Sequence, residues 1–537
     1  MERIEADYVI VGAGSAGCVL ANRLSRDSSK KVVLLEAGGR DINPWLHVPV
    51  GFFKTIDRPA YDWQYKTEPV PGLNGRSVDW PRGKGLGGSS AINGLLYVRG
   101  QAEDYDRWRQ MGNTGWGWDD VLPYFRQSEN NERGADEFHG DAGPLSVSNM
   151  RVERPITNAW LDAAQQAGYP YNPDSNGAEQ EGVGVFQFTA RKGRRCSAAV
   201  AYLNPVKHRG NLRIITHARV ARIHFEGGRA RGVAYTDRAG NTHVVRAGRE
   251  AILSGGAVNS PQLLMLSGIG EASQLQENGI ETVRDLPGVG KNMQDHLQAR
   301  LVFKTNIPTL NDEVRTLFGQ ALIGLQYVIN RSGPMTIAAS LACGFMRTRP
   351  DVATPDIQFH VQPMTAQDMK KGADRFSAFS SSVCQLRPES RGEIRITSAD
   401  PNAYPEIHPN YLATETDCQT MVNGVRIAHR IAQQPALASR ITEMFKPDAS
   451  VAMDDDAAIL EWVRGNASSI FHPAGTCKMG QDNMAVVDDR LRVHGVPGLR
   501  VVDCSIMPEI VSGNTNAPTM MIAEKAADMI IEDARSA

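Results

Sequence analysis

The sequence predicts an α/β protein whose N-terminal unit is a strand, a glycine-rich turn, a helix and a second strand. The apolar run Tyr8–Val11 is typical of a strand buried on both faces. Residues Gly12–Gly17 follow it as a G-x-G-x-x-G turn, and apolar residues at helical spacing come next. A second apolar run, Val32–Leu35, ends in the acid Glu36. This order indicates a Rossmann-like dinucleotide-binding unit.

The three glycines of the turn have different expected roles. Gly12 allows the tight turn, Gly14 lets a pyrophosphate approach the backbone, and Gly17 lets the helix pack closely. The positive end of the helix then faces the phosphates. Glu36 lies 19 residues after Gly17, where an acid hydrogen-bonds the adenosine ribose. Because a carboxylate there would repel a 2′-phosphate, NADP is disfavoured, whereas FAD and NAD both remain open.

The composition sets the scale and excludes several classes of protein. A chain of 537 residues predicts about two to four domain-sized units. The hydrophobic content of 41% and charged content of 22% are typical of a globular protein. A net charge of −2 favours neither nucleic acid nor an anionic membrane as a partner. No apolar run reaches the roughly 18 residues of a membrane helix, so we expect no integral membrane segment.

The cysteines and the N-terminus predict a cytoplasmic location. The first residues lead directly into the first strand, so we expect no signal peptide. The seven cysteines are scattered and contain no C-x-x-C pair, which favours reduced thiols over disulfides. The histidines and cysteines form no ligand-spaced cluster, so we expect no metal site.

The rest of the chain predicts a second nucleotide-side loop and a second sheet. Residues Arg82–Gly94 form a glycine-rich loop whose backbone could approach a flat ring or a phosphate. The alternating segment 211–248 predicts an antiparallel meander, and Glu250–Gly256 a further strand of the nucleotide sheet. Between 300 and about 460, strands such as Asp356–Val361 and Ser390–Ile396, with helices near 415–435 and 455–465, indicate a mixed or antiparallel sheet with helices.

Two long stretches resemble the signatures of the glucose-methanol-choline (GMC) oxidoreductases. Residues Gly83–Asn93, followed by Tyr97, Gly100 and Asp106, resemble the first signature, and Gly256–Gly270 resembles the second. The resemblance implies FAD as the dinucleotide. It also implies an FAD-binding domain made of residues 1–150, 205–300 and 465–537, interleaved with a substrate-binding α+β domain made of 151–204 and 301–464.

The resemblance extends to the cofactor-binding residues. It implies that Gly88, Ser89, Asn93 and Gly94 contact the flavin and that Val220 contacts the adenine. With the glycine turn and its surroundings, the expected cofactor-binding residues are Gly12, Gly14, Ser15, Ala16, Gly17, Glu36, Ala37, Arg82, Gly88, Ser89, Asn93, Gly94, Leu95, Val220, Asp503, Asn516, Pro518 and Thr519. Some family members attach the flavin through a histidine at the position of Ile92, which has no nucleophile. We therefore expect non-covalent FAD.

The C-terminal segment carries the expected catalytic residues. Residues Phe471–Gly480, FHPAGTCKMG, resemble the catalytic-histidine segment of the family. The resemblance implies His472 as a general base that titrates near neutral pH. It implies Asn516 as the partner amide on the substrate oxygen, in the place where many members have a second histidine. Asn516 also suits the N-cap of a helix with Pro518 in its first turn.

The expected function is the FAD-dependent oxidation of a primary alcohol (aliphatic, benzylic or choline-like) to its aldehyde. The electron acceptor is expected to be oxygen or a dye-like or quinone-like molecule, so oxidase and dehydrogenase both remain open. Two alternatives remain as well. Hydroxynitrile lyases share this fold and bind FAD without redox chemistry, and a nicotinamide-binding module would lack flavin altogether.

Overall fold

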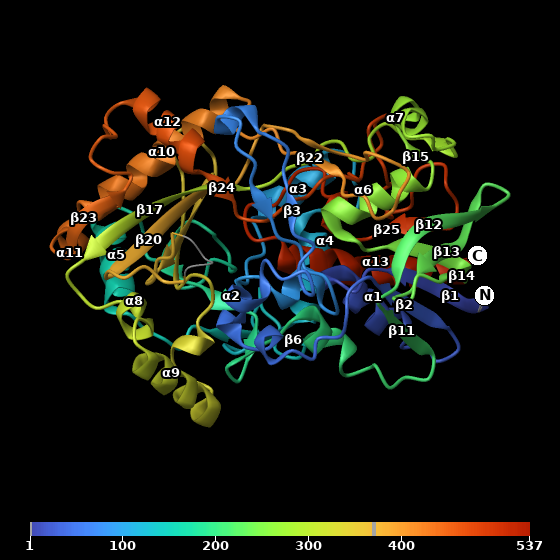
Figure 1. The fold of residues 1–537 in the computed structure, drawn as a ribbon, viewed down its shortest axis with the longest axis horizontal. Helices are drawn as coiled ribbons and strands as arrows, with labels where there is room; N and C mark the ends of the chain where they lie inside the picture. The colour runs from blue at the N-terminus through green and yellow to red at the C-terminus, as the bar shows by residue number, and fades with distance from the viewer. Residues whose placement is uncertain (1–2, 368–371, 537) are drawn as a thin grey trace.

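Two seven-stranded sheets lie side by side in the protein, each with helices packed around it (Figure 1). The computed structural model describes residues 3–367 and 372–536. Both chain termini lie at the far end of the first sheet, and the second sheet occupies the opposite end of the molecule (Figure 1). The predicted α/β architecture with a second α+β region is confirmed.

The first sheet is the nucleotide-binding sheet predicted from the N-terminal motif. Its strands, in spatial order, are β11 (Leu212–Thr216), β2 (Val32–Glu36), β1 (Arg3–Val11), β14 (Thr242–Leu253), β13 (Arg229–Thr236) and β12 (Arg219–Glu226), with β25 (Leu499–Val501) on β14. The strands β11, β2, β1, β14 and β25 pair in parallel. The helices α1 (Ser15–Leu24) and α13 (Asn516–Ser536) pack against each other beside this sheet. The sheet therefore combines segments from both ends of the chain.

The predicted meander is shorter than the segment that suggested it. The strands β12, β13 and β14 are antiparallel neighbours, but β11 pairs in parallel with β2. The strand expected at Glu250–Gly256 is the second half of β14, which continues without a break from the meander. The helix α6 (Gly256–Leu266) follows it and contains most of the second signature stretch.

The second sheet is antiparallel in every pairing. Its strands, in spatial order, are β23 (Ile441–Lys446), β17 (Leu297–Thr305), β20 (Ala378–Gln385), β19 (Ile357–Gln362), β18 (Ala342–Met346) and β7 (Gly182–Val185), with β24 (Ser468–Ser469) on β17. The start of β17 and all of β24 belong to this sheet, although the expected boundaries put them in the FAD-binding domain. The segment Ser390–Ile396 contributes β21 (Glu393–Arg395) to a separate two-stranded sheet with β22 (Glu406–His408).

Helices pack on one face of the second sheet. The helix α10 (Glu415–Ala432) packs on β20 and β17, beside α5 (Pro155–Gln166) and α12 (Asp456–Asn466). Gly424 of α10 faces Val383 and Ile357, so alternate residues of β19 and β20 point away from the helices. That opposite face carries polar side chains and faces the first sheet's side of the molecule.

The remaining elements are short or lie outside the two sheets. The helices are α2 (Phe52–Thr55), α3 (Ala102–Gln110), α4 (Trp118–Ser128), α7 (Ala272–Glu277), α8 (Leu310–Val314), α9 (Leu317–Asn330) and α11 (Pro435–Ala438). The strands are β3 (Tyr65–Lys66), β4 (Asp79–Trp80), β5 (Glu129–Asn131), β6 (Leu145–Asn149), β8 (Gln187–Phe188), β9 (Ala190–Arg191), β10 (Arg194–Arg195), β15 (Ile269–Gly270) and β16 (Arg284–Asp285). Within residues 3–367 and 372–536, no helix is long and apolar enough to cross a membrane, and no three His, Cys, Asp or Glu residues form a group that could hold a metal.

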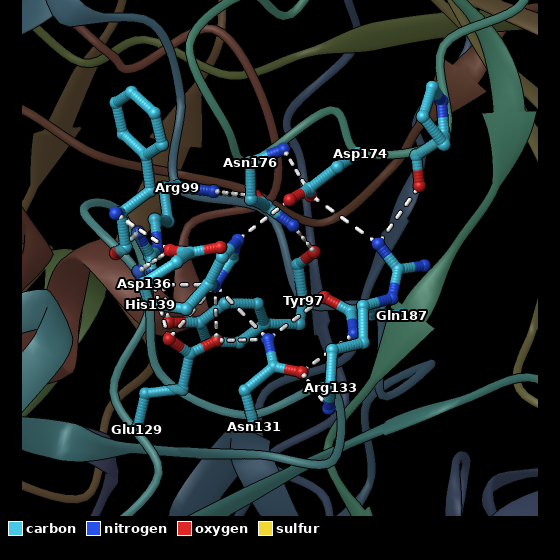
Figure 2. Close-up of polar contacts among 12 residues, drawn as sticks. Tyr97, Arg99, Glu129, Asn131, Arg133, Asp136, His139, Asp174, Asn176 and Gln187 are labelled. Atoms are coloured by element: carbon cyan, nitrogen blue, oxygen red, sulfur yellow. Dashed lines mark hydrogen bonds and ion pairs between the residues drawn. The ribbon is translucent and has the colours of Figure 1, made fainter.

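A buried polar network ties together the loops around β5 (Figure 2). Both ring nitrogens of His139 lie within hydrogen-bond distance of a carboxylate. Nε2 is 2.7 Å from Asp174 Oδ2, and Nδ1 is 3.1 Å from Glu129 Oε2. Arg99 forms an ion pair with Glu129 at 2.5 Å. Burial by itself lowers the pKa of His139, but the hydrogen bonds to Asp174 and Glu129 outweigh it and raise the pKa to about 9. In the folded protein at neutral pH, His139 is therefore protonated on both ring nitrogens and positively charged.

Candidate active site

One continuous cavity runs between the two sheets. Gly12, Gly14, Glu36 and Val220 line one end of it, and His472 lies toward the other end. Of the expected cofactor-binding residues, all except Gly17 and Pro518 line this cavity. The second sheet adds lining residues that sequence reasoning did not name. They are Gln298, Arg300, His360 and Gln362.

The glycine turn has the shape that a pyrophosphate requires. A Cβ on Gly12 would lie 2.4 Å from the Ser254 carbonyl oxygen, and Gly12 has a φ of +99°. A Cβ on Gly17 would lie 1.8 Å from the Gly12 oxygen, so Gly17 serves helix packing rather than ligand contact. Around Gly14 there is open space within 4 Å of a Cβ position. No side chain caps the N-terminus of α1, which leaves its first backbone N–H groups free for phosphate oxygens.

Glu36 joins the glycine turn to the second glycine-rich loop. Its carboxylate accepts hydrogen bonds from the backbone N–H groups of Ala13 at 2.8 Å, Gly38 at 2.7 Å and Gly85 at 3.0 Å. Burial raises the pKa of this carboxyl group, and these three donors oppose the rise. Glu36 therefore holds both loops in place while it lines the end of the cavity expected for the adenosine ribose.

Arg195 orients Asn93 in the second glycine-rich loop. The guanidinium donates to Asn93 Oδ1 at 2.7 Å and to the backbone oxygens of Ser90 at 3.2 Å and Pro49 at 3.1 Å. The N–H of Leu95 also donates to Asn93 Oδ1, at 3.1 Å. Because both donors occupy the oxygen of Asn93, its Nδ2 group is the one left to donate into the cavity. Arg195 is fully buried, and burial lowers its pKa to about 9.

His472 lies between an asparagine and a second histidine. Its Nε2 atom lies 3.0 Å from Asn514 Nδ2, and its Nδ1 atom lies 3.0 Å from His296 Nδ1. His296 Nε2 lies 3.0 Å from the Leu386 carbonyl oxygen. A carbonyl oxygen only accepts hydrogen bonds, so His296 carries its proton on Nε2 and presents an unprotonated Nδ1 to His472. His472 therefore donates from Nδ1, which leaves its Nε2 without a proton.

The orientation of Asn514 agrees with this assignment. Gln358 Nε2 donates to Asn514 Oδ1 at 3.3 Å, so the Nδ2 group of Asn514 points toward His472. A donor there requires an acceptor on His472 Nε2. The contacts on its two ring nitrogens thus agree on a neutral His472 with its lone pair on Nε2, beside an amide donor at the cavity wall.

The structure corrects the role predicted for Asn516. Its Oδ1 accepts a hydrogen bond from Ser15 Oγ at 2.7 Å, so its side chain reaches the glycine turn and not His472. Asn516 is the first residue of α13, and the Thr519 N–H bonds to the Thr515 carbonyl, which puts the cap one residue earlier than predicted. The prediction that Asn516 partners His472 is therefore wrong, and Asn514 has that position. The sequence signal was present, because the two asparagines are only two residues apart.

Asp295 positions the loop that carries His472. Its Oδ1 accepts a hydrogen bond from the His472 backbone N–H at 2.7 Å, and its Oδ2 accepts from Ser469 Oγ at 2.5 Å and from the Tyr411 hydroxyl. Phe471, next to His472, has a φ of +71°, which the loop must hold against a side-chain clash. The sequence analysis named neither Asp295 nor His296 as a site residue, and it missed both of their contacts.

Burial keeps the three histidines of this region neutral. It lowers the pKa of His472 well below its ordinary value, and nearby His296, His360 and Arg82 lower it further. Burial also lowers the pKa of His296 to about 4 and that of His360 to about 3. The expected titration of His472 near neutrality is thus displaced toward acid pH. Its Nε2 atom is available as a base at pH 7.

The comparisons with known proteins agree with the geometry. One model of the GMC oxidoreductase family matches residues 6–298, and a second matches residues 388–523. The chain belongs to the GMC oxidoreductase family. The alcohol dehydrogenase (acceptor) of Pseudomonas putida is 44% identical over 98% of this chain and 95% of that protein. The mitochondrial choline dehydrogenase of Mus musculus is 45% identical over 98% of this chain and 89% of that protein.

A solved structure shows the same fold with its cofactor. A variant of the formate oxidase of Aspergillus oryzae, studied for modification of its FAD, has a TM-score of 0.92 and 27% identity. The match covers 99% of both chains. FAD is the cofactor of this GMC oxidoreductase, and the cavity residues described above fit it. The protein is an FAD-dependent enzyme that oxidises alcohols, and none of these relatives is a hydroxynitrile lyase.

Proposed function

We propose that this GMC oxidoreductase converts a primary alcohol to an aldehyde, with His472 as the base and Asn514 as the amide on the substrate oxygen. The observation that carries this assignment is the unprotonated Nε2 of a neutral histidine, 3.0 Å from an amide donor at the cavity wall. The two-sheet architecture supports it, because the cavity is lined from both sheets and Asn514, the partner of His472, contacts Gln358 of the second sheet.

The residues of the chain account for the path of the proton. The substrate hydroxyl takes the place of the Asn514–His472 contact, donating its hydrogen to His472 Nε2 and accepting one from Asn514 Nδ2. Bound FAD would supply the acceptor for the hydride of the carbinol carbon. His472 then holds the hydroxyl proton on Nε2, and its Nδ1 proton stays directed at His296. On the side of the protein and substrate, the products are the aldehyde and a protonated His472.

The cofactor would lie along the residues that line the first-sheet side of the cavity. The turn at Gly14 and the N-terminus of α1 would hold the pyrophosphate, and Glu36 the ribose. Arg82, Asn93 and Asn514 lie toward the redox end. Asn516 would act through Ser15 on the phosphate side.

The electron acceptor and the location are part of the same proposal. We infer that the acceptor is oxygen or a dye-like or quinone-like molecule, and that the enzyme works in the cytoplasm. All seven cysteines are free, and six of them are buried, which supports a reducing compartment. Choline dehydrogenases are among the relatives of this chain. In the described part of the chain, the acids that line the cavity are Glu36 and Asp503, and both accept hydrogen bonds from backbone N–H groups on the nucleotide side. Neither is therefore placed to bind the quaternary ammonium of choline.

An alcohol panel with two acceptors tests the proposal. Primary aliphatic and benzylic alcohols should bleach the flavin under anaerobic conditions, and turnover should be followed with oxygen and, separately, with an artificial dye. His472→Ala should slow flavin reduction by about 10²–10⁴-fold while FAD remains bound. His208→Ala is the matched control, because His208 is exposed and does not line the cavity. Flavin reduction by His472→Ala at nearly the wild-type rate would remove His472 from the mechanism.

A further inference from the structure

Arg300 is a charged side chain on the polar face of the second sheet, and it lines the cavity. It belongs to β17, as does Gln298, and His296 immediately precedes that strand. Alternate residues of a strand share a face, so His296, Gln298 and Arg300 form a row that leads away from His472. Each step of two residues is about 7 Å, so the row extends the site from the base toward the substrate end.

The neighbours of Arg300 across the sheet also face the cavity side. Arg300 is opposite Ser382 on β20, and Ser382 is opposite His360 on β19. His360 lines the cavity, and its Nε2 has no hydrogen-bond partner among the described residues. The charge of Arg300 contributes to lowering the pKa of His360, which places the two side chains within electrostatic range of each other.

Arg300 has no counter-charge in the described part of the chain. Burial lowers the pKa of Arg300, and no nearby carboxylate among the described residues raises it again. The other two cations that line the cavity, Arg82 and Arg219, each have a partner within the protein. Arg82 donates to the Pro81 and Phe471 carbonyl oxygens and lies near Asp295, and Arg219 lies over the Trp63 ring. A guanidinium stays charged inside a protein, and an interior cation without a partner is unfavourable.

We propose that Arg300 binds a carboxylate of the substrate, so that the alcohol oxidised by this enzyme is a hydroxy acid whose carboxylate lies several carbon atoms from the hydroxyl group. This inference rests on the proposed function of His472 and Asn514. A single guanidinium matches one carboxylate through two parallel hydrogen bonds. A phosphate dianion would require a second positive group, and a quaternary ammonium would be repelled. Gln298 and His360 would flank the chain between the two ends.

Three benzyl alcohols that differ only in their para group test the subsite. The groups are a carboxylate, its methyl ester and a trimethylammonium, so that size is similar and charge changes. We expect kcat/KM for the carboxylate to exceed that for the ester by about tenfold to a hundredfold, and the ammonium to be the poorest substrate. The non-reacting 4-methylbenzoate should bind with a perturbation of the flavin spectrum that weakens as salt increases.

Variants of Arg300 separate a binding role from a structural one. Arg300→Gln should bring the carboxylate-to-ester ratio of kcat/KM close to one, mainly by raising KM for the carboxylate, and should abolish 4-methylbenzoate binding. Arg300→Lys should retain part of the preference, and Arg300→Glu should reverse it toward the ammonium substrate. FAD content and melting temperature identify a variant that fails to fold, and the three-substrate comparison on the wild-type enzyme remains decisive in that case.

The outcomes distinguish this inference from the function on which it depends. Equal kcat/KM for the carboxylate and the ester in the wild-type enzyme would overturn the carboxylate subsite and leave alcohol oxidation intact. An equal loss on all three substrates in Arg300→Gln would also overturn it, because it would indicate a structural role. If none of the three alcohols reduced the flavin while 4-methylbenzoate bound through Arg300, the proposed function would fail and the subsite would stand.

Discussion

His296 Nδ1 lies 3.0 Å from His472 Nδ1, and the Leu386 carbonyl on the other side of His296 determines which histidine donates in this contact. The contact fixes both the ring orientation and the tautomer of the base. His296→Ala should therefore slow flavin reduction by about 10–100-fold, through loss of the preferred tautomer and orientation. Anaerobic stopped-flow measurement gives the rate, and the FAD content shows whether the site is intact.

A glutamine at position 296 is the control for this first prediction. His296→Gln supplies an amide oxygen that can accept the His472 Nδ1 proton, so it should recover part of the rate lost in the alanine variant. Equal rates for the two variants, both far below wild type, would show that His296 acts through packing and not through the hydrogen bond.

The two asparagines at the start of α13 should separate into two functions. Asn514→Ala should slow flavin reduction, because the substrate oxygen loses its amide donor, by an amount equivalent to about 1–3 kcal/mol. Asn516→Ala should instead weaken FAD binding, because it leaves Ser15 Oγ without its acceptor beside the phosphate turn. Rates on FAD-saturated enzyme and FAD dissociation constants check both. A slower chemical step in Asn516→Ala with unchanged FAD affinity would contradict the assignment.

The pH dependence of flavin reduction should lie on the acid side. Because the folded pKa of His472 is well below 6.5, the base is unprotonated at neutral pH. The rate should be flat from about pH 7 upward and should fall only as pH drops below the ordinary histidine range. Stopped-flow reduction in pH-jump experiments from pH 5 to 9 would measure it. A tenfold rise between pH 7 and pH 9 would be inconsistent with a desolvated His472.

The His139 network should stabilise the fold at neutral pH and less at alkaline pH. The folded pKa of His139, about 9, lies above its unfolded value, so its contribution is complete below about pH 6.5 and is lost as pH rises through 9. That contribution is at most about 3 kcal/mol. His139→Gln should therefore be less stable than wild type at pH 6.5, and the gap in melting temperature should narrow toward pH 10. A constant gap across this range would argue against a charged His139.

FAD should be released intact from the denatured protein. Ile92, at the position where other family members carry the attached histidine, is buried against Leu46 and Ala91 and has no nucleophilic atom. Acid precipitation should leave all of the yellow colour in the supernatant, with the mass of unmodified FAD. Yellow colour that stays with the washed precipitate would disprove non-covalent attachment.

Local patterns predicted the nucleotide-binding half well. The run Tyr8–Val11, the glycine turn and Glu36 form a motif that spans about thirty residues of sequence, so it can be recognised locally. In the structure Gly12 and Gly17 have no room for a Cβ, and Gly14 borders open space. The second half of β14 was also predicted, from the short buried run Glu250–Gly256. The second sheet was expected to be mixed or antiparallel, and it is antiparallel. The sequence left both open, because alternation along one strand does not reveal the direction of its neighbours.

The catalytic contacts were harder to predict because they join distant segments. His296 and His472 are 176 residues apart, and nothing near His296 in the sequence indicates that its ring meets the base. Asn514 precedes α13 and contacts His472, whereas Asn516 is the first residue of α13 and contacts Ser15 in the glycine turn. An error of one or two residues in the predicted start of the helix therefore assigns the wrong asparagine to the base. Nothing in the sequence was a reason to place Arg300 in the site, because a cation on an alternating strand usually faces solvent.

The interleaved order of segments in the first sheet also has a consequence for synthesis of the chain. β1 and β2 emerge from the ribosome early, whereas β14 requires residue 253, and the strand that completes the parallel sheet, β25, begins at Leu499. His472, Asn514 and α13 come from the same late part of the chain. The nascent chain therefore carries half of a flavin site for most of its translation, with strand edges that only later segments can cover. We therefore expect the cofactor to be captured late in synthesis, after these C-terminal segments have emerged.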